Sequence, residues 1–241
     1  MTYFKYLFRE VYQNLFKKEL HNPDVSHNGL EFEIRNDVIC RFILNRLIPI
    51  VGLRPYPLNE LNLMVASVCF LKPEIIFEWG TNIGKSARIF HEICKYFHID
   101  STIHTIDLPD EIHHQEHPSN RRGYYIRSIK SVKMYQGDGV TTALDIFKSS
   151  KKDNPLFFLD GDHEYESVRR ELQLIHESVI SPKILIHDTF YQSKEAGYNI
   201  GPYLAIEDFL KNVPNIYRRI DAHLGTPGIT LLFKNLNRNH C

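Results

Sequence analysis

The sequence predicts an α/β fold in which a mostly parallel sheet is covered by helices on both faces. From residue 57 onward, short apolar segments alternate with longer segments whose apolar residues recur at helical spacing. Strands that alternate with helices in this way are typical of a parallel sheet with crossover helices. A turn from Gly225 to Gly228 separates the last two apolar segments, so we expect a hairpin and an antiparallel last strand.

Seven strands and five helices are expected in this part of the chain. Each strand is a run of β-branched, aromatic or aliphatic residues bounded by polar or turn-forming residues. The expected strands span residues 75–77, 102–106, 132–135, 155–159, 184–186, 216–220 and 229–233. The expected helices span residues 58–71, 86–97, 141–148, 165–177 and 203–211.

Local signals support these helices. Pro73 stops the first of them, because proline lacks the amide hydrogen that a continuing helix needs. Val168, Leu172 and Ile175 fall on one face of the fourth helix. Pro202 opens the fifth helix, since proline is favoured in a first helical turn.

The first 56 residues are expected to form a helical appendage, and residues 57–241 the main domain. Residues 1–20 have apolar side chains at helical spacing, and residues 38–50 also have a helical pattern. Prolines and a glycine between residues 49 and 57 then break the chain. The amphipathic first segment suits packing on the main domain or on a second subunit, and in the second case the protein would be a homodimer. Its basic residues leave a membrane-surface helix as the alternative.

Composition excludes several classes of protein. The chain has 29 basic and 29 acidic residues, and a general nucleic-acid binder needs a basic surplus. The four cysteines have no metal-type spacing, which suits a reducing cytoplasm. Charged residues interrupt the N-terminus, so no signal peptide is expected. The longest nearly apolar stretch, residues 61–71, is too short for a transmembrane segment.

Acidic residues lie at the end of five expected strands, where ligands bind in open α/β sheets. These residues are Glu78, Asp107, Asp138, Asp160 and Asp188. Any one of them could simply cap a helix, because aspartate is a favoured N-cap residue. Five acids at five strand ends are better explained by a ligand site at this edge of the sheet.

The segment from Glu78 to Ser86 holds Gly80 and Gly84 between a strand and a helix, and Asp107 follows the next strand. This pattern resembles motif I and the ribose-binding acid of class I S-adenosylmethionine-dependent methyltransferases, which have a Rossmann-like seven-stranded sheet. The segments 157–165 and 184–190 resemble a narrower branch of small-molecule and sugar O-methyltransferases, including catechol-, macrocin- and cephalosporin-hydroxylase-like enzymes. The resemblance covers about residues 57–233 and leaves the first 56 residues outside.

The resemblance implies a set of cofactor-binding residues. The loop after the first strand would hold the amino-acid part of S-adenosylmethionine, Asp107 would accept the ribose hydroxyls, and Asp138 after Gly137 would contact the adenine. The loop residues implied are Glu78, Gly80, Thr81, Asn82, Gly84 and Ser86, with Trp79 beside the pocket. The acceptor implied is a hydroxyl group of a small molecule or sugar.

The resemblance also implies a divalent metal site and a catalytic base. Asp160 occupies the place of the first carboxylate ligand, and His187 and Asp188 occupy the place of a pair of oxygen ligands. His187 departs from the family pattern, because magnesium prefers oxygen, so manganese or iron becomes as plausible as magnesium. His163 follows Asp160 by three residues and has an ordinary pKa near neutrality, which suits a general base. The alternative is that His163 only orients Asp160 or caps a helix.

Rival functions stay open at this stage. The segment from Gly80 to Ser86 is close to a nucleotide-hydrolase P-loop, but a P-loop has four residues between its glycines and this segment has three. A nicotinamide oxidoreductase would need a glycine pattern that the loop lacks. A cofactor-binding module without catalysis is the third hypothesis. The long polar stretch 109–122, with histidines at 113, 114 and 117, is expected to be an exposed lid or part of an acceptor site.

Overall fold

A computed structural model describes residue 23 and residues 32–112 and 121–234. The helix expected in residues 1–20, with the subunit or membrane contacts expected for it, lies outside these residues. The histidines at 113, 114 and 117 also lie outside them. Within the described part of the chain, no helix is long and apolar enough to cross a membrane.

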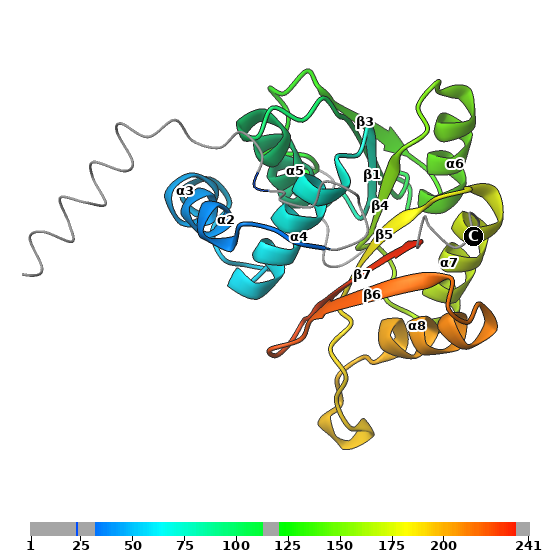
Figure 1. Ribbon diagram of the computed structural model, residues 1–241. Coiled ribbons are helices and arrows are strands. Elements are labelled where there is room, and N and C mark those ends of the chain that lie inside the picture. The colour runs from blue at the N-terminus through cyan, green and yellow to red at the C-terminus, as the bar shows by residue number, and fades with distance from the viewer. Residues whose placement is uncertain (1–22, 24–31, 113–120, 235–241) are drawn as a thin grey trace, which may run out of the picture.

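The described chain folds around one seven-stranded sheet (Figure 1). The strands lie in the order β3-β2-β1-β4-β5-β7-β6, and only β7 runs antiparallel to its neighbours, which confirms the expected mostly parallel sheet with an antiparallel last strand. The strands are β1 (Ile75–Trp79), β2 (Thr102–Asp107), β3 (Val132–Gln136), β4 (Pro155–Leu159), β5 (Lys183–His187), β6 (Tyr217–Ala222) and β7 (Ile229–Lys234).

Helices cover both faces of the sheet, as expected (Figure 1). One face packs against α4 (Leu58–Leu71) and α5 (Lys85–Tyr96), and the other against α6 (Gly139–Ser149), α7 (Tyr165–Ser178) and α8 (Gly201–Asn212). Neighbouring strand residues alternate between the two cores: Ile76 and Phe158 belong to the first, Phe77 and Phe157 to the second. This alternation buries both faces of the central strands and makes them a rigid support for the loops at their carboxyl ends.

The helical segment expected over residues 38–50 is present. It consists of α2 (Asn36–Phe42), a π-helical turn (Ile43–Leu47) and α3 (Ile48–Val51). Its buried residues, including Ile39, Phe42 and Leu47, join the same hydrophobic core as α4 and α5. The domain boundary expected at residue 56 stays a prediction, but this part of the appendage packs directly on the sheet domain.

The strand order creates a crevice between β1 and β4. The chain passes from β1 outward through β2 and β3, then returns to the other side of β1 as β4 and continues through β5. At such a switch point the connections leave the sheet in opposite directions, which opens a ligand site beyond the carboxyl ends of the strands.

Candidate active site

A cavity of about 1340 Å³ lies at the carboxyl edge of the sheet and brings together residues from five strand ends. Most of the residues that the sequence predicts for a site line it. From the cofactor set these are Trp79, Gly80, Thr81, Asn82, Ser86, Asp107, Gly137 and Asp138. From the catalytic and metal set these are Asp160, His163, His187 and Asp188. Glu78 and Gly84 support the walls and do not line the cavity.

The two glycines of the first loop are required by close packing with other parts of the protein. Gly80 has a φ of 91°, and a Cβ atom there would lie 2.0 Å from the carbonyl oxygen of Asp160. Gly84 has a φ of 81° and precedes α5, and its hydrogen faces the side chain of Ile126. A larger side chain at Gly80 would therefore push the loop after β1 away from the end of β4 and open the cavity.

Glu78 is fully buried directly before the loop. Neither of its carboxylate oxygens makes an aligned hydrogen bond with a residue that the structure describes. Burial raises the pKa of Glu78 to about 8. Charge on a buried carboxylate is costly, so a cation bound next to this loop would stabilise its charged form.

Asp107 is held in place by three donors at the end of β2. Its carboxylate accepts hydrogen bonds from the backbone amides of Asn82 at 3.2 Å and Leu108 at 2.9 Å. The guanidinium of Arg122 donates to it at 3.0 Å. These contacts fix the carboxylate beside the glycine loop, and its role as the ribose acid stays a prediction.

Asp138 has a structural role at the rim of the same cavity. Its carboxylate accepts from the backbone N–H of Thr141 at 3.0 Å, so it caps helix α6. It also pairs with the guanidinium of Arg170, with Nη1 at 3.0 Å from Oδ2. The helix-cap alternative is therefore correct for this residue, and its predicted contact with adenine stays a prediction.

Trp79 lies between the cavity and the hydrophobic core that α6, α7 and α8 form with the sheet. Its side chain occupies the space next to Gly139 and Gly161, where a Cβ atom at Gly139 would lie 2.4 Å from the ring. Its indole N–H donates to Glu171 at 2.8 Å, and burial raises the pKa of that carboxyl to about 8.

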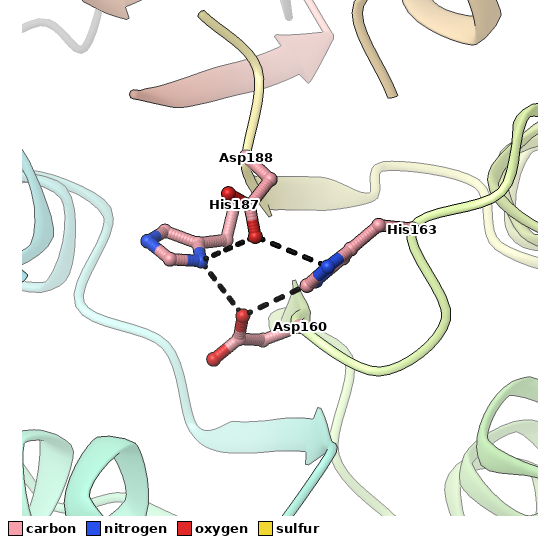
Figure 2. Close-up of side chains that lie close together, drawn as sticks. All are labelled: Asp160, His163, His187 and Asp188. Atoms are coloured by element: carbon pink, nitrogen blue, oxygen red, sulfur yellow. Dashed lines mark ion pairs between the residues drawn. The ribbon is translucent and has the colours of Figure 1, made fainter. Parts of the chain in front are cut away.

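Two aspartates and two histidines converge on the other side of the cavity (Figure 2). One ligand atom from each of Asp160, His163, His187 and Asp188 lies within 4.8 Å of the others. Nδ1 of His187 is 2.8 Å from Oδ1 of Asp160 and 3.3 Å from Oδ2 of Asp188. Nδ1 of His163 is 3.1 Å from the same Asp188 oxygen. The structure thus brings together all four residues predicted for the metal and the base.

The charges of this cluster support one another. Burial favours neutral groups, but the nearby His187 and His163 rings lower the pKa of Asp160. Burial also opposes charge on His187, yet Asp160 and the other carboxylates raise its pKa well above the usual value. Burial opposes charge on His163 as well, but the nearby carboxylates of Asp160 and Asp188 raise its pKa. Positive charge is therefore favoured at the centre of the cluster.

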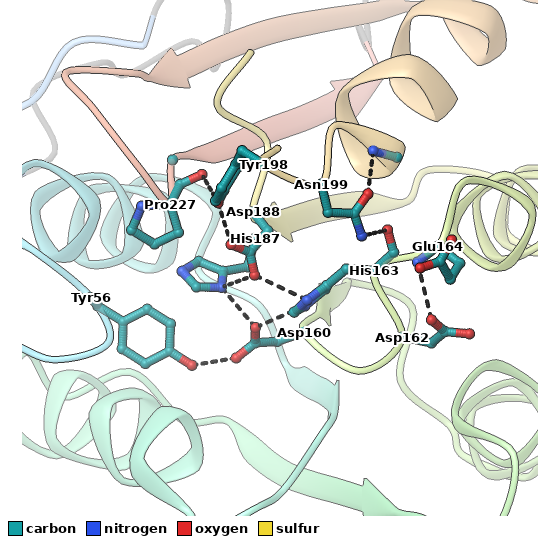
Figure 3. A network of polar contacts seen from close by, with 12 residues as sticks. Tyr56, Asp160, Asp162, His163, Glu164, His187, Asp188, Tyr198, Asn199 and Pro227 are labelled. Atoms are coloured by element: carbon teal, nitrogen blue, oxygen red, sulfur yellow. Dashed lines mark hydrogen bonds and ion pairs between the residues drawn. The ribbon is translucent and has the colours of Figure 1, made fainter. Parts of the chain in front are cut away.

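Residues from distant parts of the chain hold the cluster in place (Figure 3). The hydroxyl of Tyr56 donates to Oδ2 of Asp160 at 2.5 Å, and the hydroxyl of Tyr198 donates to Oδ1 of Asp188 at 2.6 Å. Glu60 of helix α4 pairs with Nε2 of His187 at 3.0 Å. The sequence interpretation assigned no role to Tyr56 or Glu60, because neither follows a strand.

Comparison with known proteins places this part of the chain in a family. A family model described as rhamnosyl O-methyltransferase/CmcI matches residues 55–230, which include every residue discussed for the cavity. A comparison with curated proteins finds no match.

Several solved structures share the fold at low sequence identity. An O-methyltransferase from Bacillus cereus in complex with SAH is 12% identical, with a TM-score of 0.52, and the match covers 95% of this chain and 97% of that one. A TDP-rhamnose 3'-O-methyltransferase of calicheamicin biosynthesis is 15% identical, with a TM-score of 0.51 and coverage of 80% and 86%. An SAH-bound methyltransferase from Podospora anserina is 16% identical, with a TM-score of 0.50 and coverage of 72% and 77%.

Proposed function

We propose roles for the residues of the cavity on the premise that the chain belongs to the rhamnosyl O-methyltransferase/CmcI family. The chain is an S-adenosylmethionine-dependent O-methyltransferase that transfers a methyl group to a hydroxyl of a small molecule or sugar. One observation carries the proposal: the glycine loop with Asp107 and the cluster around Asp160 face each other across a single cavity.

The glycine loop after β1 and Asp107 form what we call the cofactor half of the cavity. It binds S-adenosylmethionine, which supplies an electrophilic methyl group. Asp107 would accept the two ribose hydroxyls, since its carboxylate is fixed by backbone amides at the cavity wall. The buried carboxylate of Glu78, at the base of the loop, would stabilise the positive charge of the cofactor's amino group. The backbone of Thr81, Asn82 and the start of α5 would shape the pocket for the methionine part.

The cluster of Asp160, His163, His187 and Asp188 forms what we call the acceptor half of the cavity. It fits a divalent metal ion. The donor set is two carboxylates and an imidazole, and Nδ1 of His187 is buried without an aligned hydrogen bond to any described residue. Asp160, Asp188 and His187 would hold the ion. When bound there, it would lower the pKa of the acceptor hydroxyl and favour its deprotonation.

His163 is the proposed general base. With a proton on Nδ1, which lies 3.1 Å from Asp188, its Nε2, which lies 3.5 Å from Oδ1 of Asp160, would take a proton from the acceptor hydroxyl. Nε2 makes no aligned hydrogen bond with the described residues. The carboxylate of Asp188 would stabilise the imidazolium that results, as the acid partner of a catalytic histidine does in hydrolases. The rest of the catalysis is positioning of the acceptor oxygen against the methyl carbon.

A nucleotide-linked sugar is the acceptor class that we favour. The related protein of calicheamicin biosynthesis acts on TDP-rhamnose. In this chain Arg54 and Lys85 line the cavity, and they would supply the positive charge that a diphosphate needs. A homodimer and a cytoplasmic location stay predictions from the sequence.

An SAH-release assay tests the proposal. Purified protein, S-adenosylmethionine and a panel of TDP-sugars, free sugars and catechols are incubated with Mn²⁺ or Mg²⁺, or with EDTA. We expect SAH with at least one hydroxylated acceptor, and less of it in EDTA. Binding of ATP without binding of SAH would favour the P-loop alternative, and SAH binding without turnover of any acceptor would favour a non-catalytic binding module.

A further inference from the structure

A buried carboxylate–histidine pair joins helix α4 to the end of β5. Glu60 has an exposed fraction of 0%, and one of its carboxylate oxygens lies 3.0 Å from Nε2 of His187. The other oxygen accepts the backbone N–H of Gly228 at 2.7 Å. Both oxygens of this carboxylate are thereby committed, so Glu60 holds the imidazole in a fixed orientation.

This pairing determines which nitrogen of His187 faces the cavity cluster. A carboxylate accepts hydrogen bonds, so Nε2 carries a proton, and a metal ion in the cluster would be met by the lone pair of Nδ1. Nδ1 points to the side of Asp160 and Asp188, and it has no aligned hydrogen-bond partner among the described residues. Histidine ligands in metal sites are arranged in this way, with the second ring N–H bonded to a carboxylate.

One oxygen of each aspartate faces Nδ1 of His187, and that of Asp188 also lies 3.1 Å from Nδ1 of His163. Tyr56 takes Oδ2 of Asp160, and Tyr198 takes Oδ1 of Asp188. The remaining oxygens are the ones that lie 2.8 Å and 3.3 Å from Nδ1 of His187. Neighbouring ligands on an ion with bonds of about 2.0–2.2 Å are separated by about 2.8–3.4 Å. Both distances from Nδ1 therefore fall in the range of neighbouring ligands on one small cation, and the two oxygens lie within 4.8 Å of each other.

We infer that Glu60 makes His187 a nitrogen ligand and thereby sets the metal preference of the site, which binds Mn²⁺ and other first-row transition ions more tightly than Mg²⁺. Magnesium is a hard cation that prefers oxygen, whereas imidazole suits the transition metals. Glu60 is a positioning residue, because it contacts the ligand and not the ion. The inference rests on the proposed function for the identity of the site, and concerns which metal the site selects.

If no metal binds, the same contacts would instead stabilise a positively charged His187. A doubly protonated His187 would itself be the cation among three carboxylates, and the chain would methylate without an ion. The two accounts differ in whether a transition ion binds and whether a nitrogen contacts it.

Calorimetry and pulsed EPR on the full chain separate these accounts. We expect Mn²⁺ to bind at least about tenfold more tightly than Mg²⁺, with a ¹⁴N coupling in the Mn²⁺ spectrum. His187→Asp should remove that coupling and reduce the preference for Mn²⁺. Glu60→Gln should weaken Mn²⁺ binding about 10–100-fold. Glu177→Gln, at the far end of α7, is the matched control and should bind Mn²⁺ like the wild type.

The result that would overturn the inference is equal affinity for Mn²⁺ and Mg²⁺, no binding of either ion, or a Mn²⁺ spectrum without ¹⁴N coupling. SAH binding, measured on the same samples, reports on folding of the variants and on the proposed function. If SAH binds and Mn²⁺ is not preferred, only the inference fails. If SAH does not bind to the wild type, the proposed function fails as well.

Discussion

The two halves of the cavity are built in different ways. The cofactor half consists of consecutive residues after β1 and β2, held by backbone amides and by the close approach of Gly80 to Asp160. The acceptor half consists of side chains at the ends of β4 and β5 that depend on Tyr56, Glu60 and Tyr198.

This difference has consequences for binding and catalysis. A site made by the backbone at strand ends is fixed once the sheet forms, and it depends on few side chains. A cluster of buried charged groups depends on every partner, because removing one leaves another uncompensated. We therefore expect substitutions in the acceptor half to affect turnover and metal binding, and those in the cofactor half to affect SAH affinity.

The largest effect is expected for Asp160→Asn. The substitution removes a charged metal ligand and a partner of both histidines, so we expect kcat to fall at least about 10³-fold. SAH affinity, measured by calorimetry, should change less than about twofold, because the backbone contact of residue 160 with Gly80 is unaltered. A large loss of SAH affinity would mean that the two halves are not independent.

His163→Ala should lower kcat by about 10²–10⁴-fold, the usual contribution of a general base. In the wild type the rate should fall as the pH drops through the pKa of His163, since the protonated ring cannot accept a proton. The variant should lack this acidic limb in a pH–rate profile. A variant with an unchanged profile would show that another group is the base.

Asp107→Ala should weaken SAH binding about 10–100-fold, the loss of hydrogen bonds from a charged acceptor to the ribose hydroxyls. Its Mn²⁺ affinity should stay unchanged. Asp110→Ala is the matched control, because Asp110 pairs with the same Arg122 but lies outside the cavity lining. Equal losses in the two variants would assign the effect to Arg122 and not to the ribose acid.

The smallest effect is on stability and concerns Glu171, behind Trp79. Burial raises its pKa from 4.5 to about 8, so between these values the folded protein keeps a proton that the unfolded chain has lost. Stability should therefore fall as the pH rises through this window, by at most about 1.4 kcal/mol per pH unit.

Glu171→Gln should remove the contribution of Glu171 and leave that of Glu78, whose pKa burial also raises to about 8. Urea unfolding of the cofactor-free protein at pH 5 and pH 8 measures it, with Glu177→Gln as the control that keeps the wild-type slope. A pH dependence that is the same in wild type and Glu171→Gln would contradict the assignment.

The fold was largely predictable from the sequence. The helices over 58–71 and 165–177 and the strand over 155–159 have regular apolar patterns, and their observed bounds agree with the expected ones to within a residue. The acids at strand ends were predictable because a parallel sheet brings all its carboxyl ends to one edge.

The residues that hold the cluster in place, such as Glu60 and Tyr56, were not predictable from the sequence in the same way. Glu60 is the one charged residue of helix α4, and its contacts with His187 and Gly228 form only in the tertiary structure. Tyr56 lies in a proline-rich segment that was interpreted as a domain boundary. The role of Asp138 as the cap of α6 was recognised only as one alternative, because capping and ligand binding favour the same residue type.

The most direct test is an X-ray structure of crystals soaked with SAH and Mn²⁺, with anomalous data at the manganese edge. The account predicts SAH along the loop 78–86 with its ribose on Asp107, and one anomalous peak between Asp160, His187 and Asp188. SAH density elsewhere in the protein, or a cavity that holds the manganese ion away from these three residues, would contradict it.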